Sequence, residues 1–291
     1  MILGSHVNFG PEQLLSAAKQ AISYNANTFM FYTGAPQNTI RKPIDKELTT
    51  KAHELMKENN IDLKNVVCHA PYIVNLANKE KNWDFSINFI KSELKRCDEL
   101  KIDKMVLHPG NALKMTHEEG IKNITEALNI ILKDDANCKI LIETMAGKGT
   151  ECGINLDEIN NILTNVENKN RIGVCLDTCH LNDSGVDIKK FDDYLKNFDQ
   201  VIGIEKIGCI HLNDSKNEIG SKKDRHENIG YGTIGFKNLL DVLNNDKLKD
   251  VPKILETPFI DKYAPYKFEI EMLKSKNFNP SLEQDVINYY K

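Results

Sequence analysis

Short apolar segments alternate with longer amphipathic segments along almost the whole chain. The short segments favour strands, and we predict eight of them, at residues 2–7, 28–32, 66–68, 105–107, 140–142, 172–176, 209–212 and 254–255. A regular alternation of strand and helix is typical of a parallel sheet covered by helices. Eight such units form a (β/α)₈ or TIM barrel, so we predict an α/β protein of this fold.

Three of the intervening segments carry signals of a helix. Pro11-Glu-Gln opens the first, Asp45 can cap the second, and residues 83–100 have apolar side chains at near-helical spacing. No Pro/Ser-rich linker and no low-complexity block divides the 291 residues. We therefore predict a single catalytic domain over residues 1–291.

Histidine or acidic side chains follow every predicted strand from the third to the eighth. The C-terminal strand ends of a TIM barrel meet on one face, where the active sites of this fold lie. One further candidate follows shortly after the sixth strand, and two more lie in a polar loop after the seventh. The full set comprises His69, His108, Glu143, Asp177, His180, His211, Asp224, His226 and Glu256.

Nine such groups are too many for one tetrahedral metal ion, and the carboxylates among them need positive charge nearby. Mixed imidazole and carboxylate donors suit zinc, iron or manganese better than calcium, which prefers oxygen. With one carboxylate bridging two ions, the set suits a cluster of two or three metals. Paired metals are a common device for in-line displacement at phosphorus.

The composition indicates the cellular compartment of the protein more clearly than the class of molecule that it binds. A net charge of −4 does not indicate a nucleic-acid binder, but a basic rim around a metal cluster can still attract phosphate. Seven Cys at irregular spacing favour reduced thiols in a cytoplasmic protein. No segment is apolar enough to span a membrane, and the N-terminus does not resemble a secretory signal.

Two pairs of residues near the candidate ligands have both a structural and a functional interpretation. Tyr72 and Ile73 follow His69; residue type favours local packing, although both can act as wedges into a distorted duplex. Lys216 and Arg225 belong either to a solvated charged face or to a phosphate-facing surface, with equal support.

Other polar residues receive a structural interpretation. We expect His6 to support the barrel mouth, and Asp183 and Asp187 to cap helices or stabilise turns. Cys175 and Cys179 bracket Asp177, but without a second Cys pair we interpret them as small packing residues.

Three stretches resemble the endonuclease IV type of apurinic/apyrimidinic endonuclease, a DNA-repair family. They are His69-Ala-Pro-Tyr-Ile-Val-Asn-Leu-Ala77, Gly173-Val-Cys-Leu-Asp-Thr-Cys-His180, and Ile210 to Lys216 continuing through Gly220-Ser221 to Asp224-Arg-His226. The resemblance extends from Gly4 to Pro258. It implies a TIM barrel with three zinc ions, with manganese or iron as alternatives at one or more sites.

The resemblance also implies a role for each candidate residue. Glu143 bridges the first two ions; His69 and His108 complete the first, Asp177, His211 and Glu256 the second, and His180, Asp224 and His226 hold the third. A hydroxide between the first two ions attacks the phosphorus, while the third ion stabilises the leaving oxygen. The substrate implied is double-stranded DNA. The family cuts the phosphodiester 5′ to an abasic site and leaves a 3′-hydroxyl, and it also removes blocking groups from damaged 3′ ends. Tyr72 matches a residue that the family inserts into the minor groove, with Ile73 beside it.

One loop departs from the family pattern. After the second strand the family often has an Arg that fills the gap left by the flipped nucleotide, whereas this loop reads Thr33-Gly-Ala-Pro-Gln37-Asn38, with Arg41 further on. Gln37 or Asn38 is the alternative for that role.

Two other functions are compatible with the sequence. Sugar isomerases and epimerases use similar barrels with two metals, but they have no use for a third site. A protein that recognises damaged DNA without cutting it has no chemical need for nine ligands. We expect a monomeric nuclease that does not associate with membranes.

Overall fold

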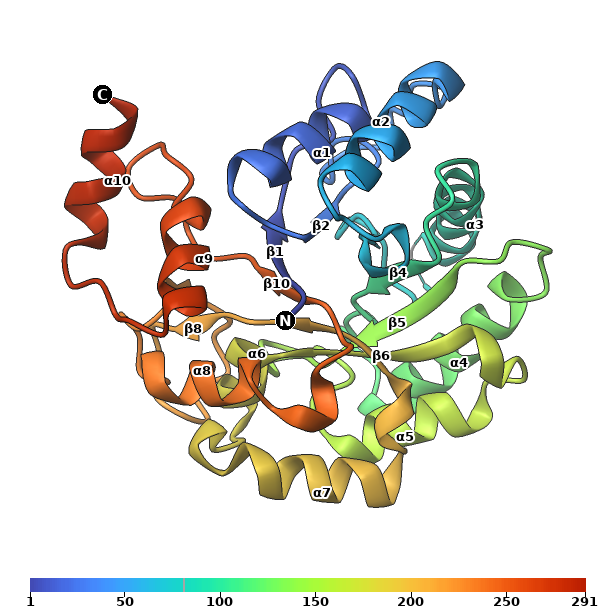
Figure 1. Cartoon of the computed structure of the whole chain (residues 1–291). Helices are drawn as coiled ribbons and strands as arrows, with labels where there is room; N and C mark the ends of the chain where they lie inside the picture. Colours follow the sequence, from blue (N-terminus) through green and yellow to red (C-terminus); the bar gives the residue numbers. More distant parts are fainter. Residues whose placement is uncertain (81) are drawn as a thin grey trace.

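Eight parallel strands close into a barrel in the order β1, β10, β7, β6, β5, β4, β3, β2 (Figure 1). The computed structural model describes every residue except residue 81. The barrel strands are β1 (Leu3–His6), β2 (Thr28–Phe31), β3 (Val67–His69), β4 (Lys104–Leu107), β5 (Lys139–Glu143), β6 (Ile172–Asp177), β7 (Ile207–His211) and β10 (Lys253–Leu255). Each coincides with a predicted strand to within a few residues, so the single-domain TIM barrel is confirmed.

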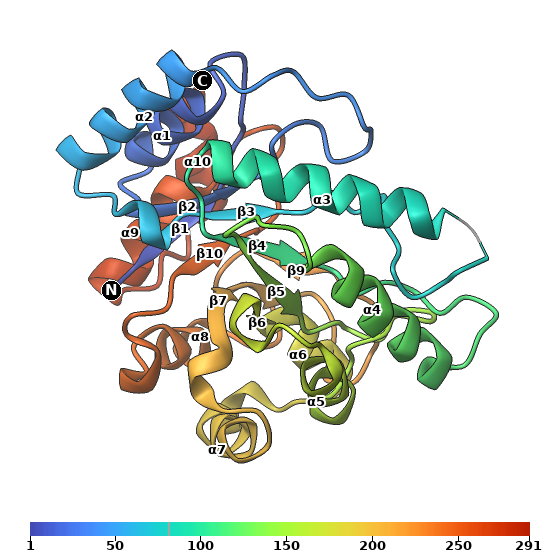
Figure 2. The same ribbon diagram turned by 90° about the vertical axis from the view of Figure 1, so that its right-hand side faces the viewer.

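Helices cover the outside of the barrel (Figures 1 and 2). They are α1 (Leu14–Ser23), α2 (Lys46–Glu58), α3 (Trp83–Glu99), α4 (His117–Ile131), α5 (Leu156–Asn165), α6 (Thr178–Ser184), α7 (Phe191–Val201), α8 (Phe236–Leu243), α9 (Tyr266–Ser275) and α10 (Leu282–Tyr290). In the described part of the chain, no helix has the length and apolar character needed to cross a bilayer.

Two of the three helix predictions are confirmed, and one is wrong at its start. The Asp45 side chain caps α2 by accepting hydrogen bonds from the backbone N–H groups of Glu47 and Leu48, and α3 lies where predicted. The first helix begins at Leu14, not at Pro11. Gln13 has φ +54°, which is not helical, and its side chain donates to Pro43 O and accepts from the N–H of Asp45.

The core has two layers. Seven side chains fill the inside of the barrel, namely Met30, Val67, Val106, Leu141, Cys175, Cys209 and Ile254. A larger cluster lies between the strands and the helices. Leu141 fits inside because Gly208 has no side chain, since a Cβ there would lie 2.6 Å from Leu141 Cδ2. All seven Cys are buried and free, and Cys175 packs inside the barrel. The Sγ atoms of Cys175 and Cys179 also lie within 4.8 Å of candidate metal ligands.

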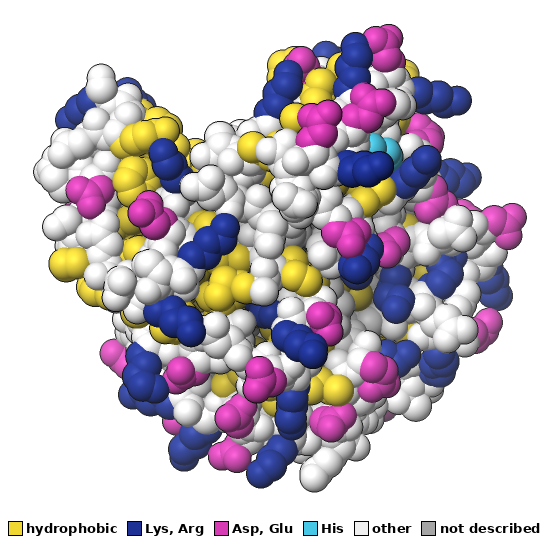
Figure 3. All heavy atoms as spheres, in the orientation of Figure 1, with side chains coloured by type: hydrophobic (Ala, Val, Ile, Leu, Met, Phe, Trp, Pro, Cys, Tyr) yellow, Lys and Arg dark blue, Asp and Glu magenta, His cyan; other side chains and the backbone are white. Residues whose placement is uncertain are grey.

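A short antiparallel hairpin extends the loop after β7. Its strands β8 (Asp214–Ser215) and β9 (His226–Glu227) pair Ser215 with His226. The hairpin therefore returns the chain to the C-terminal ends of the barrel strands. On the face seen in Figure 3, Lys and Arg side chains alternate with Asp and Glu, in keeping with the small net charge.

Candidate metal centre

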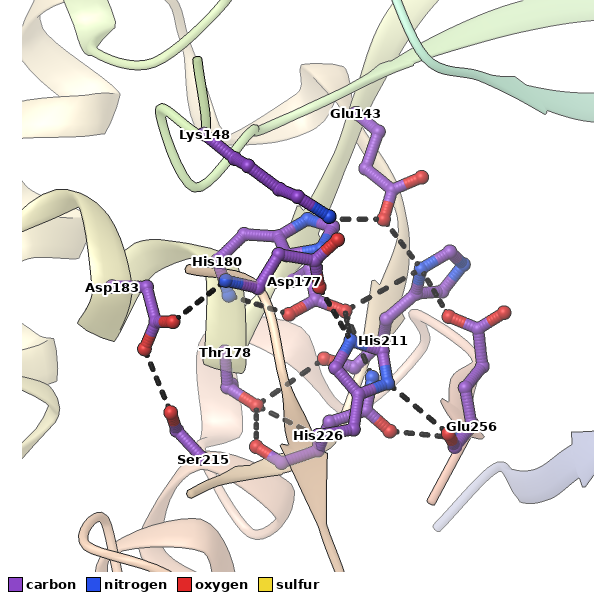
Figure 4. Close-up of polar contacts among 12 residues, drawn as sticks. Glu143, Lys148, Asp177, Thr178, His180, Asp183, His211, Ser215, His226 and Glu256 are labelled. Carbon is purple, nitrogen blue, oxygen red and sulfur yellow. Dashed lines mark hydrogen bonds and ion pairs between the residues drawn. The ribbon is translucent and has the colours of Figure 1, made fainter. Parts of the chain in front are cut away.

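The C-terminal face of the barrel gathers all nine predicted side chains into three groups. Within each group the ligand atoms lie within 4.8 Å of one another. The groups are His69, His108 and Glu143; Glu143, Asp177, His211 and Glu256; and His180, Asp224 and His226. The groups come from strands far apart in the sequence, and Figure 4 shows several of these residues and their neighbours converging.

Glu143 lies between the first two groups. It ends β5, is 1% exposed, and its two carboxylate oxygens face different partners. Oε2 lies 3.2 Å from Nε2 of His69 and 3.0 Å from Nε2 of His108, whereas Oε1 lies 2.9 Å from Nδ1 of His211. A carboxylate whose two oxygens face separate sets of imidazoles is able to bridge two metal ions.

Backbone carbonyls fix the orientation of three imidazoles. Nδ1 of His69 donates to Ala70 O at 2.7 Å, and Nδ1 of His180 donates to Thr144 O at 2.8 Å. In the same way, Nδ1 of His226 donates to Glu256 O at 3.1 Å. In the neutral imidazole each bond places the proton on Nδ1, so the Nε2 atom that is turned toward the carboxylates has a free lone pair, as is usual for metal-binding histidines.

The third group is assembled from α6, directly after β6, and the β8–β9 hairpin. Nε2 of His180 lies 3.0 Å from Oδ1 of Asp224, and Nε2 of His226 lies 3.6 Å from the same oxygen. Nε2 of His226 is also 3.7 Å from Oδ2 of Asp177, so the third group adjoins the second. Asp177 itself caps α6, since its Oδ1 accepts from the N–H of His180 at 2.8 Å.

Burial and charge act against each other in this cluster. Burial opposes ionisation of Glu143, but the imidazoles of His211 and His108 outweigh it and hold the pKa of the carboxyl well below its usual range. Burial likewise opposes the charged form of His180, yet Asp177, Asp224 and Glu143 raise its pKa well above the ordinary value. The carboxylates therefore draw positive charge to the site, as protons or as metal ions.

The donor set fits transition-metal ions. It combines imidazole nitrogens with carboxylate oxygens, the mixture that zinc, manganese and iron accept. Nε2 of His226 is buried and has no hydrogen-bond partner among the described residues, although it faces two carboxylates. A buried nitrogen without a partner is costly unless a ligand occupies its lone pair.

Two buried residues to which the sequence analysis gave no role at the site hold the ligands in place. Asn213 donates to Oδ2 of Asp177 at 2.8 Å and accepts from the N–H of Glu256 at 2.7 Å, linking two ligands. Asp183 was expected to cap a helix or turn. Instead its carboxylate accepts from Ser215 Oγ, Asn217 Nδ2 and the N–H of Asp224. Only their place beside ligand-bearing stretches could have drawn attention to them.

A groove of about 890 Å³ adjoins the cluster. Its wall includes His6, whose ring lies 4.8 Å from that of Tyr32, and Tyr32 in turn lies 5.2 Å from the ring of His69. His6 thus lies at the barrel mouth, but not as the hydrogen-bonded support that the sequence suggested, because its buried Nε2 has no hydrogen-bond partner among the described residues. Burial lowers the pKa of His6 to about 4. The described lining contains no Asp or Glu, and it includes Lys42 and Arg96.

The remaining predicted residues lie around the mouth, outside the three groups. Tyr72 is 56% exposed, so local packing does not account for it, whereas Ile73 is half-buried and packs against the core. Gln37 is exposed and Asn38 half-buried in the loop that lines the groove. Lys216 and Arg225 are exposed on the β8–β9 loop, where Nζ of Lys216 lies 3.7 Å from Glu227.

A closed parallel barrel with imidazoles and carboxylates gathered around a shared Glu143 defines a TIM-barrel enzyme with a candidate multinuclear metal centre. Residues 18–276 match the family described as xylose isomerase-like TIM barrel. A probable endonuclease 4 from Pediococcus pentosaceus is 50% identical over 297 aligned positions, which cover 99% of this chain and 100% of the relative. The chain therefore belongs to the endonuclease IV family of nucleases.

Solved structures agree with this assignment. Endonuclease IV from Thermus thermophilus has a TM-score of 0.82 and 25% identity, with 94% of this chain and 98% of that chain covered. A D-tagatose 3-epimerase-like protein has a TM-score of 0.69 at 21% identity, covering 100% of this chain and 99% of that chain, and it shares the fold alone. The resemblance predicted from the three sequence stretches is confirmed.

Proposed function

We propose that this protein is a metal-dependent DNA-repair endonuclease that hydrolyses the phosphodiester 5′ to an abasic site and leaves a 3′-hydroxyl. The observation that carries the proposal is the set of three adjoining ligand groups, two of which share Glu143. Two groups alone would suit a sugar isomerase equally well. The third group, formed by His180 and the β8–β9 hairpin, favours phosphodiester chemistry because charge develops on both the attacking and leaving oxygens.

We assign the three groups to three zinc ions, with manganese or iron as alternatives at one or more positions. His69, His108 and Glu143 would hold the first ion, Glu143, Asp177, His211 and Glu256 the second, and His180, Asp224 and His226 the third. Bound divalent ions supply Lewis-acid chemistry, which activates water near neutral pH and offsets negative charge on phosphate oxygens.

The chain's own residues have supporting roles in this reaction. Glu143 keeps the first two groups at a fixed separation, and the backbone carbonyls of Ala70, Thr144 and Glu256 hold three imidazoles with Nε2 turned toward the carboxylates. No Lys, Tyr or Ser side chain is needed as the main base. All nine donors come from one chain, which is consistent with a monomer as the active form.

The surroundings of the cluster fit a DNA strand. The exposed Lys216 and Arg225 attract the phosphates of a DNA strand, and the groove does not repel them, because its described lining contains no carboxylate. The exposed ring of Tyr72 suits insertion into the minor groove beside Ile73. Gln37 and Asn38 are the candidates for filling the gap left by a flipped nucleotide. A site open at one side also accommodates a 3′ end, so we extend the proposal to removal of 3′-blocking groups.

Metal analysis together with a nicking assay tests the proposal. We expect about three metal equivalents per chain and a metal-dependent cut 5′ to a single abasic site in a duplex. In Glu143→Gln the cut should be lost and the metal content should fall, because the first two groups share this carboxylate. Glu151→Gln is the matched control, because Glu151 is also buried in the loop after β5 but bonds only the backbone of Gly147 and Lys148. Two metal equivalents and no cutting would contradict the proposal and favour an enzyme that acts on sugars. Tight binding of abasic DNA without cutting would favour a protein that only recognises the damage.

A further inference from the structure

The loop between β2 and α2 forms one wall of the groove beside the cluster. Residues 33–38 of this loop line the groove, together with Ile40 and Lys42. The tip is open to solvent, since Gln37, Thr39 and Ile40 are exposed. The loop contains no helix or strand, so its shape depends on side-chain contacts to its backbone.

Arg41 provides these contacts from inside the loop. Its side chain is only 8% exposed, and its Nη1 lies within hydrogen-bond distance of three backbone carbonyls of the loop. The distances are 3.3 Å to Ala35 O, 3.1 Å to Asn38 O and 3.0 Å to Ile40 O. The guanidinium also lies 5.0 Å from the centre of the Phe89 ring. A planar guanidinium presents its donors in a fixed fork, whereas an ammonium group is a compact point charge on a flexible stem.

Helix α3 anchors this arginine and both ends of the groove-lining part of the loop. Glu93 is fully buried; its Oε1 accepts from Nε of Arg41 at 2.8 Å and its Oε2 from Thr33 Oγ1 at 2.6 Å. Arg96 donates to Thr33 O at 3.0 Å and to Lys42 O at 2.8 Å. Thr33 and Lys42 are the first and last residues of the part of the loop that lines the groove, so α3 fixes the span of this part while Arg41 fixes its interior.

The loop is built to admit this side chain. A Cβ on Gly34 would lie 2.8 Å from Nη1 of Arg41, so any larger residue there would displace the guanidinium. Glu93 is paired with Arg41 and lies close to Arg96 in the same hydrogen-bond network. Loss of Arg41 would leave the buried carboxylate without its ion-pair partner, which strongly destabilises a folded protein. Such a network is not expected at a freely moving surface loop.

We propose that Arg41, held by Glu93, is a positioning residue that shapes the groove wall for the DNA strand. Arg41 is committed to the loop interior and does not enter the DNA, while the loop presents the amides of Gln37 and Asn38 at its tip. This inference rests on the proposed function, because it assumes that the groove binds the substrate of the metal cluster.

The test compares Arg41→Met with Arg171→Met in the full-length, metal-loaded protein. Arg171 is a matched control, since its guanidinium also donates to three backbone carbonyls, those of Leu132, Asp134 and Cys138, next to the N-terminal ends of the strands. Hydrogen exchange of the amides of residues 34–41 is measured without DNA, and nicking kinetics are measured on a duplex with one abasic site.

We expect Arg41→Met to accelerate exchange in the loop and to raise KM ~10-fold with kcat changed less than ~3-fold, because ground-state and transition-state binding weaken together. Arg41→Lys keeps a positive charge beside Glu93, so the fold should be stable, but it lacks the fork of donors that contacts the loop carbonyls. KM should therefore remain raised in this variant. Arg171→Met should alter neither KM nor loop exchange.

Unchanged loop exchange in Arg41→Met would overturn the positioning role. Faster exchange with unchanged KM would overturn the link between the loop and the substrate. If the wild-type protein does not nick abasic DNA, the proposed function fails, and the exchange data still decide whether Arg41 holds the loop.

Discussion

At the residue scale, a few buried polar side chains connect the ligands to the rest of the barrel. Asn213 bonds Asp177 and the backbone of Glu256, so one amide holds two strand ends in register. Glu269 has a similar role, but it contacts neighbours of the ligands rather than the ligands themselves. Its carboxylate accepts from Asn228 Nδ2, Thr257 Oγ1 and the N–H of Ile229, which are close neighbours of His226 and Glu256 in the sequence.

Glu269 should make stability depend on pH. Burial raises its pKa to about 7, although hydrogen bonds from Thr257, Ile229 and Asn228 offset part of the effect. Between the unfolded pKa of 4.5 and about 7, the folded protein binds more protons than the unfolded chain. The contribution of Glu269 is therefore complete below pH 4.5 and lost as pH rises through 7, a change of about 3 kcal/mol at about 1.36 kcal/mol per pKa unit.

The change to measure is Glu269→Gln, which cannot ionise. Urea unfolding of both proteins at pH 5 and pH 8, at equal metal concentration, should show that the wild type loses more unfolding free energy than the variant between these pH values. Parallel pH dependences would contradict a raised pKa at Glu269.

At the element scale, the sequence predicts the strands and their ends well, but not what lies between them. His69, Glu143 and Asp177 were predictable because each ends an apolar strand, and the barrel brings such ends together. The start of α1 and the role of Asp183 were not predictable. Both depend on hydrogen bonds to distant residues, which leave no periodic signal in the local sequence.

The β8–β9 hairpin shows the consequence. Its strand β9 and the loop before it carry His226 and Asp224, but it has only two residues in each strand and depends on the buried Asp183 of α6 for its position. Asp224 has φ +54°, an uncommon conformation that the bond from its N–H to Asp183 Oδ2 at 2.9 Å helps to hold.

Asp183→Asn should therefore release the third ligand group and leave the first two intact. Asp183 uses both carboxylate oxygens as acceptors, whereas an amide has only one acceptor oxygen. In the variant the NH₂ group of the new side chain would therefore face a donor, either Ser215 Oγ or the N–H of Asp224. We expect metal content to fall from about three to about two equivalents, with a loss of nicking of at least ~10-fold.

Asp187→Asn is the control, because Asp187 only caps the short helical turn Ile188–Lys190. Full metal content in Asp183→Asn would show that the hairpin keeps its place without this carboxylate.

At the scale of the whole molecule, the cluster joins most of the barrel. Its ligands lie at the ends of β3, β5, β6 and β7, directly after β4 and β10, in α6 and on the hairpin. Four of the nine side chains are carboxylates gathered on one face, where like charges repel unless cations separate them. The sequence could predict this gathering from the strand ends, whereas the separations within each group required the folded barrel.

Metal removal should consequently destabilise the whole fold rather than one loop. Metal that binds only the folded chain adds about 2.7 kcal/mol when its concentration is about 100 times Kd. For a domain of this size each kcal/mol corresponds to about 2–4 °C in Tm. Thermal unfolding with and without a chelator should thus differ by several degrees, and added zinc should restore the higher Tm. Glu143→Gln should respond much less, because it lacks the bridge between two groups. A chelated protein with an unchanged Tm would mean that the cluster does not depend on cations for its charge balance.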